Sequence, residues 1–246
     1  MVVISAYRGQ MRRMRFHMRC VSSSQAPLAR VLEVLPDRAP PLRENRRIVR
    51  MGQPRYRAAM SYPVQLIRPK RHGDARGWFT EVYSVPAFDA LGISCTFVQD
   101  NHSLSAPAFT LRGLHFQTPP HGQDKLVRCI RGRIFDVAVD VRRDSPTYGK
   151  WVGAELSAEN GHQPFIPIGF AHGFLTLDAD CEVTYKCSDT YAPACDGGIR
   201  WDSVGIDWPM PADAVPELSP KDRAQPTLAE FDSPFSYDGR PLGALA

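Results

Sequence analysis

Short segments rich in β-branched and aromatic residues follow one another through most of this chain, and residues typical of turns separate them. Many short strands at near-regular spacing favour a β-sandwich or a β-barrel. The segments that we expect to form strands are Phe79–Tyr83, Thr96–Asn101, Thr110–Phe116, Lys125–Arg131, Arg133–Val141, Lys150–Leu156, Gln163–Ile166, Ala171–Thr176 and Cys181–Cys187.

The segment Arg133–Val141 shows which side chains share a face. Phe135 and the valines at 137, 139 and 141 alternate with Asp136, Ala138 and Asp140. Two acids on an otherwise apolar strand need partners if that face is buried. Asp136 or Asp140 then supports a buried basic group, and a solvent-facing strand is the equal alternative.

Two turns that contain glycine connect predicted strands. Gly132 is placed where a tight hairpin would join Lys125–Arg131 to Arg133–Val141. The segment Pro167–His172, P-x-G-x-x-H, resembles the second half of the cupin signature and delivers a histidine onto a strand. We therefore expect a mainly β, cupin-like double-stranded β-helix, a small jelly-roll barrel with a few short helices.

The first half of the cupin signature supplies metal ligands as H-x-H with a later glutamate, and this chain offers only His115 there. One imidazole without a neighbouring carboxylate is a poor site for a transition metal. We expect neither a metal nor a cofactor, which disfavours a metal-dependent oxygenase. Together with Arg112, Lys125, His172 and Tyr185, His115 instead indicates proton-transfer chemistry on an anionic substrate.

The charge of the chain is divided unevenly. Residues 1–59 contain thirteen arginines and three acids, whereas residues 60–246 contain seventeen bases and twenty-three acids. The first segment could be a transit peptide, a nucleic-acid-binding arm or a disordered extension that precedes a true start at Met60. We favour the disordered extension, with a short amphipathic helix possible only at Leu28–Leu35, and a cupin-like domain over residues 60–246.

The remaining composition points to a cytoplasmic protein. No apolar run approaches the roughly 18 residues that a membrane span requires. Six cysteines are scattered without a C-x-x-C pair, so we expect reduced thiols rather than a zinc ribbon or a redox motif. The acidic body has no basic stripe for nucleic acid. We expect no membrane and no nucleic-acid partner.

Eight motifs occur in order along the second segment. They are GDxRGWFxE at Gly73–Glu81, FVQDNHS at Phe97–Ser103, LRGLHFQ at Leu111–Gln117, KLVRCIRGxIFDVAVDVR at Lys125–Arg142, FIPxGFAHGF at Phe165–Phe174, YKCSDxYAP at Tyr185–Pro193, GIRWD at Gly198–Asp202 and LSPKD at Leu218–Asp222. The chain resembles the dTDP-4-dehydrorhamnose 3,5-epimerase family over about residues 62–230.

The resemblance implies an isomerase of dTDP-rhamnose biosynthesis that inverts C3 and C5 of dTDP-4-keto-6-deoxyglucose without a cofactor. Each inversion needs a base on one face, an acid on the other and a stabiliser for the enolate oxygen. By resemblance His115 is the base, Asp222 its paired carboxylate, Lys125 the group at the C4 oxygen and Tyr185 the opposing acid.

The resemblance also implies a nucleotide site and a homodimer. Arg76 and Arg112 match diphosphate contacts, for which guanidinium forks are suited. An N-terminal strand crosses between subunits in such relatives, so Arg76 and Phe79 are expected to reach the partner's site. Other positions that match contacts with sugar, base or phosphate are Phe79, Glu81, Gln99, Asn101, His172 and Lys221.

Asp196 departs from the resemblance, because the family usually has a glutamate in the segment after Y-A-P. If this shorter carboxylate contacts the ligand, we expect a longer contact or a bridging water. Two alternatives stay open beside the double epimerase: an enzyme that acts at C3 or C5 only in a secondary-metabolite pathway, and a non-catalytic cupin that binds sugar nucleotides.

Overall fold

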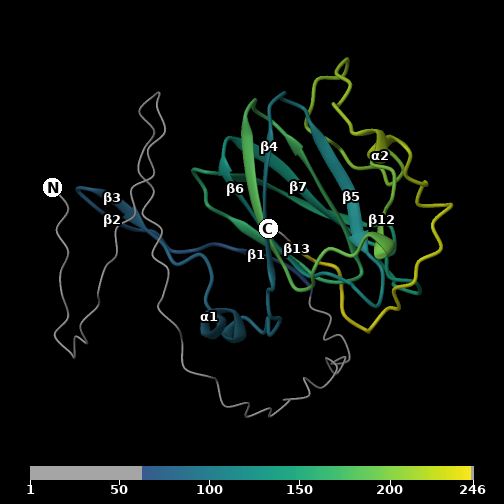
Figure 1. The fold of residues 1–246 in the computed structure, drawn as a ribbon, viewed down its shortest axis with the longest axis horizontal. Helices are drawn as coiled ribbons and strands as arrows, with labels where there is room; N and C mark the ends of the chain where they lie inside the picture. The colour runs from purple at the N-terminus through teal and green to yellow at the C-terminus, as the bar shows by residue number, and fades with distance from the viewer. Residues whose placement is uncertain (1–62, 245–246) are drawn as a thin grey trace, which may run out of the picture. The chain divides into compact units, whose positions relative to one another are not determined.

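The computed structural model describes residues 63–244 (Figure 1). The expected disordered extension over residues 1–59, the boundary at residue 60 and the helix expected at Leu28–Leu35 lie outside the described residues. Within residues 63–244 no helix has the length and apolar character needed to cross a membrane. The expected mainly β fold is confirmed, because strands dominate and only short helices accompany them.

Two sheets face each other and form a jelly-roll barrel (Figure 1). The six-stranded sheet contains, in spatial order, β13 (Gly243–Ala244), β1 (Val64–Ile67), β9 (Gln163–Ile166), β6 (Lys125–Arg131), β11 (Cys181–Cys187) and β4 (Gln99–Ser105). The five-stranded sheet contains β12 (Asp196–Gly198), β5 (Leu111–Gln117), β10 (Phe170–Thr176), β7 (Arg133–Asp140) and β8 (Trp151–Ser157). Neighbouring strands are antiparallel except for β1 and β13.

Alternation along the strands decides what enters the barrel. Ile134 and Ala138 of β7 pack in the core between the sheets, whereas Val137 and Val139 pack on the outer face of the five-stranded sheet. Asp136 and Asp140 are fully buried on the inner side of the same strand. The expected alternation is thus confirmed, and each acid has a basic partner, His172 and Arg142 respectively.

The prediction of a hairpin at Gly132 is wrong. Gly132 does adopt a turn, with φ of 73°, but β6 pairs with β9 and β11 whereas β7 pairs with β8 and β10. The chain therefore passes from one sheet to the other at this glycine. A tight turn signal fixes a change of direction, and the choice of pairing partner depends on strands far away in sequence.

Two expected strands are displaced from their actual positions. The pairing of β3 (Gly77–Phe79) ends at Phe79, opposite His72 at the start of β2 (His72–Asp74), so residues 80–83 have no partner strand. Similarly, β4 begins at Gln99, opposite Cys187 at the end of β11. In both cases the length of the partner, rather than the β propensity of the segment, sets the boundary.

Segments outside the sheets cover their outer faces. Helix α1 (Val85–Ala90) contributes Phe88 to a cluster on the six-stranded sheet. The C-terminal segment packs Ile206 and Phe235 against the five-stranded sheet, next to Phe116 of β5. Along this segment helix α2 (Pro220–Arg223) lies beside β5 (Figure 1). This packing places α2 next to the strand that carries His115.

Strands β5 and β10 approach unusually closely. A Cβ atom at Gly113, where φ is 140°, would lie 2.6 Å from the Cα atom of Gly173. Only glycine at both positions allows this approach. The register of the two strands shifts here, so that Arg112 pairs with Phe174 and His115 pairs with His172.

Candidate active site

His115 and Asp222 form a close pair between β5 and α2. The Nε2 atom of His115 lies 2.5 Å from Oδ1 of Asp222, and the two side chains are 29% and 4% exposed. Ser219 caps α2, with its hydroxyl oxygen accepting the backbone N–H of Asp222 at 3.1 Å. The cap and Pro220 at the start of the helix hold the carboxylate in place beneath the imidazole.

The charge of Asp222 decides the tautomer of His115. Burial raises the pKa of Asp222, but the hydrogen bond and charge of His115, with help from Ser219 and Lys221, hold that pKa below its ordinary value. The carboxyl group is therefore ionised and accepts a hydrogen bond from the Nε2–H group of His115. Nδ1 of a neutral His115 then carries the lone pair, which is what a general base requires.

Lys125, the first residue of β6, brings a cation into the barrel from the facing sheet. Its buried Nζ donates to the backbone oxygen of His115 at 3.3 Å. Burial lowers the pKa of Lys125, while the nearby carboxyl group of Asp136 acts in the opposite direction. A buried ammonium next to the histidine is suited to stabilising an oxyanion in this dry surrounding.

His172 is the direct cross-strand neighbour of His115, so both imidazoles leave the same face of the five-stranded sheet. Its Nε2 lies 2.8 Å from Oδ2 of Asp136. Burial lowers the pKa of His172 and outweighs the opposing effect of Asp136. The ring is therefore neutral near pH 7. The other oxygen of Asp136, Oδ1, has no hydrogen-bond partner among the described residues.

Tyr185 lies on the sheet opposite the two histidines. It lies on the inward side of β11 with Val183 and packs against the barrel core. Its hydroxyl makes no hydrogen bond to another described residue, and burial raises its pKa above the ordinary value. The phenol thus stays protonated at neutral pH, as a proton donor must.

Polar side chains surround the mouth of the barrel above these groups. Asp196 of β12 accepts Nζ of Lys221 at 2.5 Å and the hydroxyl of Tyr191 at 2.9 Å. Gln99 binds the side chain of Asn101 and the backbone N–H of Tyr191. The structure therefore brings Asp196, Lys221, Gln99 and Asn101 together around Tyr191.

Tyr191 was not among the predicted site residues. Its place in the Y-A-P motif, on the loop after β11, was the signal that could have indicated it. Asp136 was predicted only as support for an unnamed base, and the structure identifies that base as His172.

Arg112 lies on the same strand as His115, near the opposite end of the inner face. Its guanidinium group donates to the Ser105 hydroxyl and the Leu104 backbone oxygen, each at 3.0 Å. These two bonds leave other N–H groups of the guanidinium able to bind an anion.

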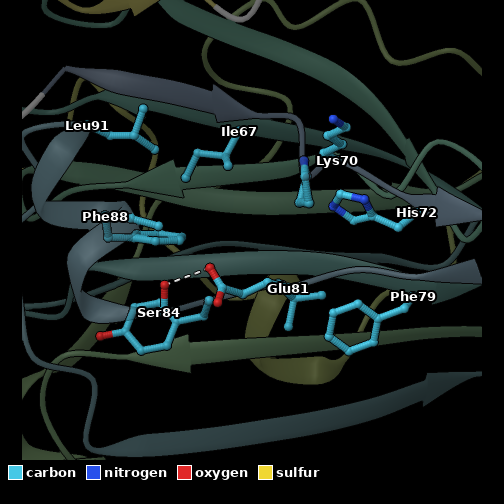
Figure 2. A pocket seen from close by; sticks show the side chains of 12 residues that line it. Ile67, Lys70, His72, Phe79, Glu81, Ser84, Phe88 and Leu91 are labelled. Carbon is cyan, nitrogen blue, oxygen red and sulfur yellow. Dashed lines mark hydrogen bonds between the residues drawn. The ribbon is translucent and has the colours of Figure 1, made fainter.

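Three predicted residues lie elsewhere. Among the described residues Arg76 pairs with Asp74 in the β2–β3 hairpin, and Phe79 at the end of β3 is 70% exposed. Glu81 accepts the Ser84 hydroxyl at 2.7 Å in a separate cavity of about 290 Å³ beside α1, which Phe79 also lines (Figure 2). Within residues 63–244 no hydrogen bond or ion pair joins these three residues to His115 or its neighbours.

Metal-ligating side chains do not gather around the site. Among the described residues there is no group of three or more His, Cys, Asp or Glu side chains that could hold a metal ion. The five cysteines of the described region, at positions 95, 129, 181, 187 and 195, are free thiols.

The similarity of this chain to known proteins points to one family. The sequence model of the dTDP-4-dehydrorhamnose 3,5-epimerase family matches residues 62–230. A dTDP-4-dehydrorhamnose 3,5-epimerase of Sinorhizobium fredii is 53% identical over 71% of this chain and 89% of its own length.

Two solved structures extend this comparison. The dTDP-6-deoxy-D-glucose-3,5-epimerase of Legionella pneumophila, in complex with dTDP-4-keto-L-rhamnose, has a TM-score of 0.66 and 44% identity and covers 70% of this chain and 93% of that one. A 3'-monoepimerase of Streptomyces bikiniensis in complex with dTDP-quinovose has a TM-score of 0.64 and 35% identity and covers 69% and 88%. Of these two structures, the one named as a 3,5-epimerase has the higher sequence identity to this chain.

Proposed function

The chain belongs to the dTDP-4-dehydrorhamnose 3,5-epimerase family, and we propose that His115, Lys125 and Tyr185 carry out its two inversions. The enzyme is an isomerase of dTDP-rhamnose biosynthesis that acts on C3 and C5 of dTDP-4-keto-6-deoxyglucose. The observation that carries the assignment is the division of the site. His115, paired with Asp222 of α2, lies on one sheet, and a protonated tyrosine lies on the facing sheet.

The base in this proposal is Nδ1 of His115. It removes the proton from a carbon next to the C4 ketone, and the electron pair of the broken C–H bond moves to the ketone oxygen. The imidazolium that forms is stabilised by Asp222, which is already ionised and bound to Nε2. No other group has to move at this step.

The enolate oxygen takes its stabilisation from Lys125. The ammonium is buried next to the backbone of His115, so a ketone held over His115 places its oxygen within reach of Nζ. A preorganised cation at a developing oxyanion is among the largest contributions available to an enzyme. Neutral His172 lies beside His115 and adds a ring nitrogen to the same surface.

Tyr185 completes each inversion from the opposite face. Its phenol donates a proton to the carbon that lost one, and the C4 ketone re-forms as the electron pair returns. Because base and acid stand on different sheets, the proton arrives on the face opposite to that from which it left. The configuration of the carbon is thereby reversed. Before the next inversion the imidazolium of His115 gives its proton to solvent and the phenolate of Tyr185 takes one from solvent.

The dTDP portion is held by the mouth of the barrel in this proposal. Lys221 at this mouth and Arg112, farther along β5, supply positive charge for the diphosphate, and Tyr191 offers an exposed ring to the base. Gln99 and Asn101 add carboxamide groups beside the ring of Tyr191. Asp196 stands between Tyr191 and Lys221 and holds both.

We also propose a homodimer in which the β2–β3 hairpin completes the partner's site. Support comes from the hairpin itself, which presents Trp78 and Phe79 to solvent at 53% and 70% exposure with Arg76 beside them. These residues match nucleotide contacts but do not reach the site of their own chain. A mixture of His115→Ala and Phe79→Ala chains should recover activity that neither possesses alone, and no recovery would refute the exchange.

Residues 1–59 are proposed to be dispensable for catalysis, and the enzyme is proposed to work in the cytoplasm. All residues assigned to the reaction lie in the matched region, and the free thiols of the described cysteines suit a reducing compartment. Removal of residues 1–59 should leave the rate of epimerisation unchanged. A rate that fell severalfold would assign the extension a part in folding or assembly.

The direct test is proton exchange in deuterated water. With dTDP-4-keto-6-deoxyglucose, NMR should show deuterium entering at both C3 and C5, whereas exchange at one carbon would indicate a single-site enzyme and none a binding protein. His115→Ala should abolish exchange but leave dTDP binding nearly intact. Tyr185→Phe should slow inversion more than proton loss, and equal slowing would refute the assignment of opposite faces.

A further inference from the structure

The loop that carries Tyr191 combines an exposed ring with a firmly held backbone. Tyr191 is 58% exposed, and within the described region its ring stacks on no other aromatic side chain. Its backbone N–H donates to Oε1 of Gln99 at 2.9 Å, and its hydroxyl donates to Oδ2 of Asp196 at 2.9 Å. A large aromatic surface is thus fixed in solvent without packing against the protein.

Gln117 holds the residues on both sides of Tyr191. It is the last residue of β5 and only 4% exposed. Its Oε1 accepts the backbone N–H of Ala192 at 2.7 Å. Its Nε2 donates to the backbone oxygens of His121 at 2.7 Å and Thr190 at 3.2 Å. Two carbonyls and one N–H leave a single possible orientation for this carboxamide, because its oxygen cannot donate and its nitrogen cannot accept.

The residue paired with Gln117 in the sheet holds the hydroxyl end of the Tyr191 ring. Gln117 is the direct partner of Asp196 across β5 and β12, and Asp196 holds the hydroxyl of Tyr191. We propose that Gln117 is a positioning residue that orients the ring of Tyr191 as a preformed stacking surface for the nucleotide base. This assignment rests on the proposed function, since it takes Tyr191 as a contact of the dTDP portion.

The physical reason lies in the order of the loop before binding. A mobile aromatic ring has to be immobilised when a ligand stacks on it, and that loss of freedom weakens binding. The bonds of Gln117 to Thr190 and Ala192 remove the freedom in the free protein. The carboxamide of Gln117 bonds to backbone atoms of His121, Thr190 and Ala192 and to none of the groups that move protons. Its loss should therefore raise KM and leave kcat nearly unchanged.

The test is a double-mutant cycle on Gln117→Met and Tyr191→Ala, read by calorimetric titration with dTDP and by steady-state epimerisation. Stacking on an aromatic side chain corresponds to roughly 5- to 150-fold in affinity. We expect Tyr191→Ala to weaken dTDP binding by about tenfold and Gln117→Met to approach that loss. The double variant should bind no more weakly than Tyr191→Ala, because Gln117 acts through the ring.

Asn160→Leu is the matched control. The carboxamide of Asn160 also makes three backbone hydrogen bonds, to Ser157, His162 and Glu155, but in the β8–β9 turn. We expect Asn160→Leu and Gln117→Met both to lower the melting temperature. Asn160→Leu should leave the affinity for dTDP unchanged. If Gln117→Met does not fold, Gln117→Glu replaces it, since it keeps the acceptor for Ala192 and removes both Nε2 donors.

Several outcomes would overturn the assignment of Gln117 alone. If the parent protein is active and its Gln117 variant binds dTDP as tightly as the parent, Gln117 does not position the ring. Losses that add in the double variant would mean that Gln117 acts independently of Tyr191. A fall in kcat without a change in dTDP affinity would place its effect at the reaction centre. A parent protein that binds dTDP without epimerising would refute the proposed function, whereas the binding cycle would still decide the role of Gln117.

Discussion

Replacing Asp222 with asparagine removes the negative charge beside His115 while keeping the size of the side chain. Opposite charges about 4 Å apart attract by about 4 kcal/mol at an effective dielectric constant of about 20. That dielectric suits this pair, because Asp222 is 4% and His115 29% exposed. The imidazolium formed on proton abstraction would lose most of this attraction. We expect a loss of about 3 kcal/mol in the transition state, or about 10²-fold in rate.

Deuterium exchange at C3 and C5 is the assay for Asp222→Asn, because it reports proton removal independently of product release. Binding of dTDP should change little, since the substitution keeps the size of the side chain next to Lys221, the proposed diphosphate contact. The matched control is Glu182→Gln, which removes a carboxylate from His102 outside the barrel interior and should exchange like the parent. Exchange by Asp222→Asn within about threefold of the parent would refute the argument that charge, rather than packing, stabilises the imidazolium.

Three further predictions concern the cation, a buried ion pair and the close strand approach. Burial lowers the pKa of Lys125 from 10.5, so the ammonium is lost and activity falls as pH rises through that lowered value. Lys125→Arg keeps its charge and should shift the alkaline limb of kcat/KM to higher pH, and an unshifted limb would contradict this. Arg142→Met leaves the fully buried Asp140 without its cation and should lower the free energy of unfolding by about 3–5 kcal/mol. An unchanged urea midpoint would contradict the role of that pair. Gly113→Ala forces a Cβ against Gly173 and should destabilise by about 1–3 kcal/mol and disturb exchange at His115, so a fully stable, active variant would count against this packing.

The sequence predicted strand positions better than strand partners. The bounds expected for β6, β9 and β11 match the structure, because glycine, proline or a polar turn interrupts the pattern at their ends. The prediction of pairing partners failed at Gly132, where the two flanking strands belong to different sheets. Pairing is decided by contacts between strands distant in sequence, to which local pattern is blind.

The candidate site divides in the same way. The residue types of His115, Lys125 and Tyr185 were visible in strand patterns, and motif order added Asp222, which is 107 residues from His115. That distance shows why geometry was needed: a four-residue helix at the end of a long segment carries the carboxylate. No local pattern indicated that Gln117 fastens the Tyr191 loop, because its three bonds go to backbone atoms and carry no side-chain signature.

The arrangement of charge explains why the site can be built inside a barrel at all. Asp222 is ionised before the reaction, and in the proposed mechanism the cation on His115 forms directly beside it. In that mechanism the enolate forms at the same moment, within reach of the ammonium of Lys125, which donates to the backbone oxygen of His115. Each new charge therefore meets an opposite charge that is already in place, so proton removal requires no large reorientation of dipoles. Neutral His172 and protonated Tyr185 add polar groups without adding charge, which limits the cost of burying the whole set.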